Sequence, residues 1–384
     1  MQHRRIIRFT HVAAAVAASS LLVASCGAGS SDDEGGSIKV GVVLSLSGPA
    51  APFGIPERDA AEAYIDDVND QGGIDGRKIE LIVEDDKTNP TEAASAAQSL
   101  VDEGVVAIIG STTGSATQAM SAVTTAAEVP ILGLNTAVGI SGPYTFLATV
   151  GDEEMIPAIF DRMVAEGHTR IAVFHQEDAL GQYGAELFEE LAAENRDVEI
   201  VATASAPLDA TDVSAQASRL RNADPDAVFV AVSATGLASG FLRAADSIGL
   251  DVPGFGGMSL AQDAILEAAG PAAEGFTVAN IIDSAAVLEN QTGLYELLEA
   301  AGIEPVGGFP ELGGAGAASM VVAALREAGP SADGNAIVEA WESGIEMETF
   351  TKTPGTFGPE RRNAHTADVL VWTHAVDGEF VGVE

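Results

Sequence analysis

Residues 39–44 have the sequence KVGVVL, an almost uninterrupted apolar run rich in valine that predicts a buried β-strand. Similar short runs recur along the chain, and segments with helical spacing, such as Ala116 to Ala127, lie between them. The strand candidates are Lys39–Leu44, Ile79–Glu84, Val105–Ile109, Ile131–Leu134, Arg170–Phe174, Glu199–Thr203, Ala227–Ala231 and Asp368–Trp372. Because near-continuous apolar strands that alternate with helices form parallel sheets covered on both faces, the sequence predicts an α/β fold.

The alternation of strands and helices continues from residue 38 almost to the end of the chain, which indicates two similar lobes rather than one open sheet. Phe146–Val150 and Phe276–Ile282 contain no helical stretch, so we expect them to cross between the lobes. A third crossing is expected near Thr353–Pro359. The predicted boundaries are residues 38–148 and 283–354 for the first lobe and residues 149–282 and 355–384 for the second.

The beginning of the chain is typical of a secretory signal. Three arginines within the first eight residues precede an uncharged run, Val12 to Ser25, which is shorter than the ~20 residues of a membrane-spanning helix. The run ends at Cys26, and residues 22–26, LVASC, resemble the lipobox of bacterial lipoproteins. We expect a signal peptide over residues 1–25, a lipid anchor on Cys26 and a flexible Gly/Ser/acidic tether over 26–37. An ordinary signal peptide or a twin-arginine signal is the alternative.

The composition excludes several classes of function. With 57 Asp+Glu against 18 Lys+Arg and a net charge of -39, the chain is repelled by phosphate backbones, so we expect no nucleic-acid partner. A single cysteine allows no internal disulfide and no zinc site that needs two thiolates. The histidines lack metal-ligand spacing, and Glu84–Asp86 is expected to cap turns rather than to bind a cation. The sequence therefore predicts neither a metal nor a cofactor.

Two patterns imitate enzyme motifs. Gly257–Ala261 departs by one residue from a nucleophile elbow with Ser259 as the nucleophile, and only Asp368 followed by His374 has the required order. Both partners fall in one strand candidate rather than on separate loops, which disfavours a hydrolase. Gly314–Ser319 imitates part of a dinucleotide fingerprint, but no strand candidate precedes it, so we expect a helix packed closely against a neighbour. The sequence thus predicts a protein that is not an enzyme.

Two polar loops follow neighbouring strand candidates. The first is rich in hydroxyl groups and leads directly into a helix, whose N-terminal backbone N–H groups suit a carboxylate. The second is short and polar. Ligands of open α/β sheets bind beyond the carboxyl ends of the strands, so both loops are expected to face one crevice, although each could simply cap a helix. The residues concerned are Thr113, Gly114, Ser115, Asn135, Thr136 and Ala137.

Several segments together carry a family resemblance that covers essentially all of residues 38–384. They are Ile38–Pro49 with Phe53-Gly54, Asn69–Ile79 with Asp85-Asp86, Ile108–Ser111, His175–Gly181 and Thr356–Glu360. In these segments the chain resembles the substrate-binding proteins of branched-chain amino acid ABC transporters, which have the type 1 periplasmic-binding-protein, or Venus-flytrap, fold. The segments of the N-terminal third are the most specific.

The resemblance implies two Rossmann-like lobes with parallel-rich sheets, joined by three crossing strands, that close on a small ligand by hinge motion. In such proteins the first lobe holds the carboxylate of the ligand through hydroxyl groups and backbone amides. The matching residues here are those of the two polar loops, 113–115 and 135–137. Phe53 corresponds to an aromatic residue that covers the ligand.

The second lobe departs from the family pattern at two places. Leu180 stands where relatives commonly have an aromatic residue, and Met258 and Ser259 stand where an acid commonly meets the ammonium group of the ligand. Because neither is acidic, Asp178 or Asp263 is the candidate replacement. Without such an acid, the ligand would be an amide, a carboxylic acid or another small neutral compound.

These observations predict an extracytoplasmic receptor, anchored to the membrane by lipid, that works as a monomer without a cofactor. It would capture a small amino-acid-like or related polar ligand and deliver it to an ABC permease. A sensory ligand-binding subunit of the same fold is the main alternative, and a hydrolase that uses Ser259 is the weaker one.

Overall fold

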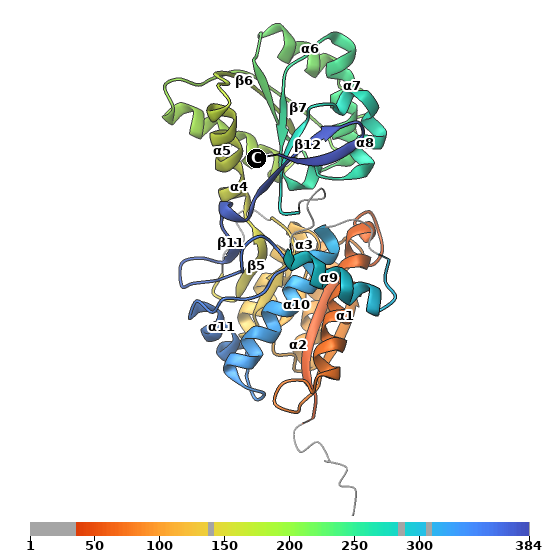
Figure 1. Ribbon diagram of the computed structural model, residues 1–384. Helices are drawn as coiled ribbons and strands as arrows, with labels where there is room; N and C mark the ends of the chain where they lie inside the picture. Colours follow the sequence, from red (N-terminus) through yellow and green to blue (C-terminus); the bar gives the residue numbers. More distant parts are fainter. Residues whose placement is uncertain (1–35, 137–141, 283–288, 305–308, 384) are drawn as a thin grey trace, which may run out of the picture. The chain divides into compact units, whose positions relative to one another are not determined.

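The computed structural model describes residues 36–136, 142–282, 289–304 and 309–383, which form two α/β lobes (Figure 1). The predictions for residues 1–25, for Cys26 and for the first part of the tether lie outside these residues. Within the described ranges, no helix combines the length and the apolar character that crossing a bilayer requires.

The first lobe is built on a six-stranded sheet with the order β11-β5-β4-β3-β1-β2, in which every neighbouring pair is parallel. Its strands are β1 (Ile38–Leu44), β2 (Ile79–Asp85), β3 (Ile108–Gly110), β4 (Ile131–Gly133), β5 (Thr145–Val150) and β11 (Asn363–His365). Its helices are α1 (Ala51–Asp70), α2 (Pro90–Asp102), α3 (Gly114–Ala127), α9 (Glu289–Ala300), α10 (Phe309–Ala328) and α11 (Gly334–Glu342).

Successive side chains of these strands enter two different cores. Val42 and Leu132 belong to the cluster beneath α1 and α10, whereas Val43 and Ile131 belong to the cluster beneath α2 and α3. A strand buried on both faces needs apolar residues at every position, because its side chains alternate between the faces. This explains why the run at residues 39–44 is continuous rather than alternating.

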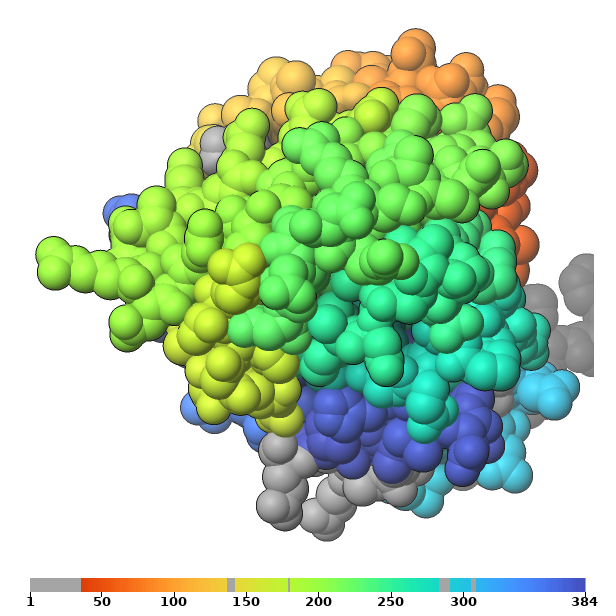
Figure 2. All heavy atoms as spheres, turned by 90° about the horizontal axis from the view of Figure 1, so that it is seen from above, coloured from red at the N-terminus to blue at the C-terminus, as the bar shows by residue number. Residues whose placement is uncertain are grey.

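The second lobe is built on a seven-stranded sheet with the order β13-β12-β10-β9-β8-β6-β7. Its strands are β6 (Arg170–Gln176), β7 (Glu199–Ala206), β8 (Ala227–Ala231), β9 (Gly254–Gly256), β10 (Thr277–Asn280), β12 (Val371–Val376) and β13 (Glu379–Val383). Its longer helices are α4 (Asp152–Ala165), α5 (Ala179–Glu194), α6 (Ser214–Asn222) and α7 (Thr235–Ile248), followed by the short 3-10 turn η1 (Met258–Leu260) and α8 (Asp263–Ala269). The strands from β7 to β10 run parallel, while β12 and β13 form an antiparallel edge. Figure 2 shows this C-terminal segment, in dark blue, beside the teal segment that contains β10.

The fold class predicted from the sequence is confirmed, but some elements differ from their predicted bounds. The strand expected at Val105–Ile109 starts only at Ile108. The strand expected at Asp368–Trp372 is wrong in its first half, because residues Ala367–Val369 form a 3-10 turn in which Thr366 donates a hydrogen bond to the carboxylate of Asp368. The strand β12 starts only at Val371. Strand β11 still pairs with β5 in the first sheet, so the chain passes to the second sheet after His365 and not near residues 353–359.

The glycine-rich segment 314–319 lies inside helix α10, as expected from the missing strand before it. Helices α1 and α10 run side by side (Figure 1), and a β-carbon at Gly314 would lie 1.9 Å from the backbone oxygen of Glu57 in α1. Glycine is therefore required at this position because the two helix backbones approach too closely for any side chain. The neighbouring Gly313 has no such contact, since a β-carbon there would meet no atom within 4 Å.

The two glycines should respond in opposite directions to the same substitution. Gly314→Ala forces α1 and α10 apart and should lower the free energy of unfolding by about 1–3 kcal/mol or more. Gly313→Ala removes backbone freedom from the unfolded chain without a clash and should raise it by about 0.5–1 kcal/mol. Urea denaturation followed by circular dichroism measures both. Equal effects of the two variants would contradict the close approach of the helices at Gly314.

Candidate functional site

The first polar loop joins β3 to the N-terminus of α3, where Thr113 is the capping residue in extended conformation. The side chain of Thr113 makes no capping hydrogen bond to the helix, and Ser115 is exposed in its first turn. The hydroxyl of Thr117 instead accepts the backbone N–H of Ser111 at 3.0 Å and so closes the loop from within. The simple interpretation that Thr113 only caps the helix is therefore wrong, and its hydroxyl and that of Ser115 lie beside the positive end of α3.

The second polar loop is tied to the first through Asn135. The Asn135 side-chain nitrogen donates to the backbone oxygen of Ser111 and to the hydroxyl of Thr117, both at 2.8 Å. The backbone oxygen of Asn135 accepts a hydrogen bond from Thr149 in β5. Asn135 therefore holds the ends of three neighbouring strands in register, which makes it a positioning residue. Thr136 follows it and is half-buried, whereas Ala137 lies outside the described residues.

Two buried acids lie beneath the first loop. Asp86 accepts hydrogen bonds from the hydroxyls of Ser45 and Ser111 and from the backbone N–H of Thr88, so it joins the ends of β1, β2 and β3. Glu57 of α1 is 1% exposed, and its carboxyl group accepts the hydroxyl of Thr112 at 2.6 Å. Burial raises the pKa of Glu57 to about 8, although the hydrogen bond from Thr112 opposes this effect. The acid therefore carries its proton at neutral pH.

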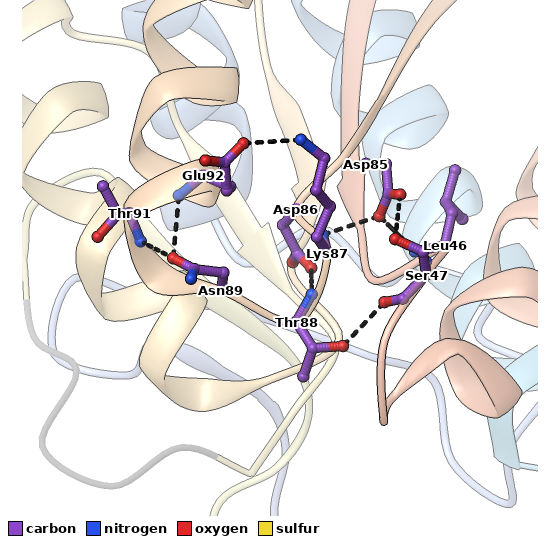
Figure 3. Close-up of polar contacts among 9 residues, drawn as sticks. All are labelled: Leu46, Ser47, Asp85, Asp86, Lys87, Thr88, Asn89, Thr91 and Glu92. Atoms are coloured by element: carbon purple, nitrogen blue, oxygen red, sulfur yellow. Dashed lines mark hydrogen bonds and ion pairs between the residues drawn. The ribbon is translucent and has the colours of Figure 1, made fainter.

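The acids at the end of β2 accept hydrogen bonds from backbone N–H groups of the neighbouring turns, as expected. Asp85 accepts the N–H groups of Leu46 and Lys87 and both polar groups of Ser47 (Figure 3). Asp85 is partly desolvated, but these hydrogen bonds outweigh that effect and lower its pKa. Asn89 caps α2 by accepting the N–H groups of the next helical residues. In the part of the chain that the structure describes, no group of three or more His, Cys, Asp or Glu is placed to hold a metal ion.

The second lobe also has an amide side chain at the end of a strand. Gln176, at the end of β6, accepts the N–H and the hydroxyl of Ser233 after β8 and donates to the carboxylate of Asp178. Asp178 also caps α5 by accepting the N–H of Gly181 at 2.9 Å. The carboxylate of Asp178 is therefore engaged within its own lobe, and Asp263 is exposed at the start of α8. Neither arrangement favours the role of a buried acid for a ligand.

The remaining predicted residues are distributed unevenly. Phe53, near the start of α1, and Leu180, near the start of α5, are half-buried. Met258 is 6% exposed and belongs to a buried apolar cluster to which both lobes contribute, whereas its neighbour Ser259 is exposed. The site predicted from the sequence thus consists of strand-end loops in both lobes, together with Met258 in the core.

The structure does not assemble a serine triad from the described residues. The hydroxyl of Ser259 donates to the backbone oxygen of Val232, His374 is bonded to the hydroxyl of Thr277, and Asp368 accepts the hydroxyl of Thr366. Each candidate thus has a different partner. Burial also lowers the pKa of His374. These contacts oppose the hydrolase alternative.

Two α/β lobes with polar loops at the carboxyl ends of parallel strands define a two-lobed binding protein for small solutes. The sequence model of the periplasmic binding protein family matches residues 37–378, and the chain belongs to this family. The family is extracytoplasmic, and the resemblance to its branched-chain amino acid type is confirmed.

Known relatives cover almost the whole chain. The Leu/Ile/Val-binding protein homolog 3 of Brucella melitensis is 26% identical over 358 residues, which is 90% of this chain and 94% of the relative. A branched-chain amino acid transporter substrate-binding protein from Streptococcus pneumoniae, solved with isoleucine, is 22% identical with a TM-score of 0.74, over 90% of this chain and all of that one. A solute-binding protein from R. palustris, solved with 4-hydroxybenzoate, is 20% identical with a TM-score of 0.77, over 91% and 96%.

The positioning role of Asn135 can be separated from a role in binding. Asn135→Ala removes the donor for the backbone oxygen of Ser111 and the hydroxyl of Thr117. It should therefore lower the free energy of unfolding of the protein without ligand by about 1–3 kcal/mol. Thr113→Ala removes no capping hydrogen bond and should change it by less than about 0.5 kcal/mol. Urea denaturation gives both values. If Thr113→Ala lowers the free energy of unfolding as much as Asn135→Ala does, Thr113 also holds the loop.

The buried acid Glu57 should make stability depend on pH. Its pKa is 4.5 in the unfolded reference and about 8 when folded, so its stabilising effect is complete below pH 4.5 and is lost as the pH rises through 8. Glu57→Gln keeps an acceptor for Thr112 and should be more stable than the wild type at pH 9. Through Glu57, the free energy of unfolding of the wild type should fall by at most about 1.4 kcal/mol per pH unit.

Urea denaturation between pH 5 and pH 9 measures the difference between the two proteins. The control is Glu103→Gln, which changes an exposed acid of the same lobe. Parallel pH profiles for the wild type and Glu57→Gln would mean that Glu57 does not change its charge in this range.

Proposed function

We propose that this protein captures a small amino-acid-like or related carboxylate ligand at the strand ends of its lobes and delivers it to an ABC permease. The observation that carries the proposal is the N-terminus of α3, where the hydroxyls of Thr113 and Ser115 are not used to cap the helix. Backbone N–H groups at the positive end of a helix, with hydroxyl groups beside them, suit a carboxylate. Binding and hinge closure, without bond chemistry, would constitute the mechanism.

The relatives support this proposal and leave the ligand open. One is a Leu/Ile/Val-binding protein homolog, one was solved with isoleucine and one with 4-hydroxybenzoate. The latter two ligands have in common a carboxylate on a partly apolar body. A carboxylate held at α3 is therefore the element of recognition that we transfer to this chain.

Cys26 is proposed as the site of a lipid anchor, followed by the tether to the first strand. Because the net charge of -39 repels anionic lipid heads, attachment to the membrane would depend on the acyl chains and not on the protein surface. Mass spectrometry of the protein extracted from membranes tests this point, because a lipidated Cys26 should be the first residue of the mature chain. An unmodified cysteine would remove the anchor from the proposal.

A ligand screen tests the binding function. Thermal melting with amino acids, small amides and aromatic acids should reveal at least one compound that raises the melting temperature in proportion to its affinity and concentration. The same compound should reduce the radius of gyration in small-angle scattering, as expected for hinge closure. If no compound shifts the melt, capture of a solute from these classes is wrong.

Thr113→Ala should weaken binding of the carboxylate ligand found in that screen. The loss of a hydrogen bond to a charged group corresponds to about 1.5–3 kcal/mol, or a factor of about 10–100 in Kd measured by calorimetry. Thr91→Ala is the matched control, because Thr91 is an exposed hydroxyl residue in the first turn of the neighbouring helix α2. Equal affinities for the wild type and Thr113→Ala would place the carboxylate elsewhere.

A further inference from the structure

Glu57 is a buried acid beneath the loop that we propose to hold the carboxylate of the ligand. Its carboxyl group accepts a hydrogen bond from the hydroxyl of Thr112 at 2.6 Å. The preceding residue, Ser111, donates its own hydroxyl to Asp86. Two buried acids from different elements therefore hold two consecutive residues of the loop, and the residue that follows them in the chain is Thr113.

Glu57 has no cation to balance a negative charge in the described part of the chain. None of the ion pairs found there includes it, and the neighbouring Arg58 is paired with Asp59 and Glu62. Helix α10 covers the backbone of Glu57 so closely that a β-carbon at Gly314 would lie 1.9 Å from its oxygen. A carboxylate that is 1% exposed and lacks a countercharge is costly, so burial favours the protonated acid.

The charged groups of the neighbouring elements do not supply the missing cation. Asp86, at the end of β2, acts on Glu57 with its negative charge, whereas Lys87 is paired with Glu92 of α2 (Figure 3). Helix α3 and the loop between β1 and α1 contain no titratable side chain. In the first three turns of α10, the titratable residue is Glu311, which is another acid.

These surroundings determine the charge beneath the loop. Burial raises the pKa of Glu57 to about 8, against the lowering effect of Thr112 and with a further increase from Asp86. With its proton, Glu57 adds no charge beneath Thr113, and the backbone N–H groups at the N-terminus of α3 can then attract an anion. When Glu57 ionises, its negative charge repels a carboxylate bound to the same loop.

We propose that the loop holds a carboxylate ligand more tightly when Glu57 carries a proton, so that Glu57 is a positioning residue that weakens capture in alkaline solution. This inference rests on the proposed function and adds a regulation of the same site. Glu57 acts through its bond to Thr112 and through its charge. By linkage, a bound carboxylate must also strengthen the binding of the proton to Glu57, so that the two events favour each other.

Calorimetric titrations at pH 7 and pH 9 test the inference. The probes are L-isoleucine and benzoate, titrated separately, because both contain a carboxylate. If binding requires the proton, the Kd of the wild type should be about 10-fold higher at pH 9 than at pH 7, because a group with a pKa of about 8 loses its proton between these values. Glu57→Gln has no proton to lose, so its Kd should not change in this way.

Two controls accompany the titrations. Asp66→Asn changes an exposed acid on the same helix and should keep the wild-type ratio of the two Kd values. Circular dichroism at pH 9 checks that each protein is folded, because the ionisation of Glu57 should also lower the stability of the wild type.

Proton uptake on binding provides a readout that a merely structural acid would not give. At pH 8 about half of the Glu57 side chains are ionised without ligand, so the wild type should take up as much as about half a proton for each probe molecule bound. Calorimetry in phosphate and in Tris at the same pH measures this uptake, because the two buffers differ in the heat that accompanies the release of a proton. The uptake should be absent in Glu57→Gln.

The variant also separates Glu57 from other groups that titrate in this range. Asp152 of α4 has a pKa of about 7, and the amino group of isoleucine loses its proton in alkaline solution. A change in Kd that either of these groups causes persists in Glu57→Gln, whereas the change caused by Glu57 disappears. An increase in Kd of the same size in both proteins would therefore overturn the proposal.

The outcomes distinguish this inference from the proposed function. If the wild type binds a probe and its Kd does not rise from pH 7 to pH 9, the role of Glu57 is wrong and solute capture stands. If neither probe binds, the same titrations are made with the carboxylate compound that gives the largest shift in the thermal screen. A wild type that binds no compound of that screen contradicts both proposals.

Discussion

One buried carboxylate organises the first lobe. Asp86 accepts hydrogen bonds from Ser45, Ser111 and Thr88, which follow three different strands. Side chains of strand-end loops have no ladder of backbone hydrogen bonds to hold them, so a shared acceptor must replace it. With Asp86 in place, Ser111 is fixed, and Thr117 and Asn135 are then positioned by their bonds to Ser111. The proposed ligand loop is therefore a consequence of this network.

The second lobe solves the same problem with an amide. Gln176 is fully buried and connects the loop after β8 to Asp178, which caps α5. An amide both donates and accepts, whereas a carboxylate only accepts, so Gln176 can join a backbone N–H to an acid. The two lobes share their topology of parallel strands, but the chemistry at their strand ends differs.

The sequence predicted the fold more completely than the site, for a physical reason. Strands buried on both faces require continuous apolar runs, and these are visible in residues 39–44 without any knowledge of contacts. The polar loops were also predictable, because their hydroxyl and amide residues follow such runs directly. Asp152 and Glu57 were not. Asp152 begins α4, where an acid is most simply a favourable partner of the helix dipole, whereas Glu57 lies in the second turn of α1, where the sequence does not reveal its burial. Only burial shows that these two acids have a different environment.

Burial alone does not give an acid a role in binding, and the two acids illustrate why. Glu57 has a hydrogen bond from Thr112 and a pKa of about 8, so at neutral pH it is protonated and needs no countercharge. Asp152 accepts a hydrogen bond from Thr136, and burial raises its pKa to about 7. Because both acids are buried, hydrogen-bonded to a threonine and shifted in the same direction, these properties do not distinguish a structural acid from one that meets a ligand. The overall acidity of the chain does not select a ligand either, because exposed charges are screened by salt and act equally on every cation.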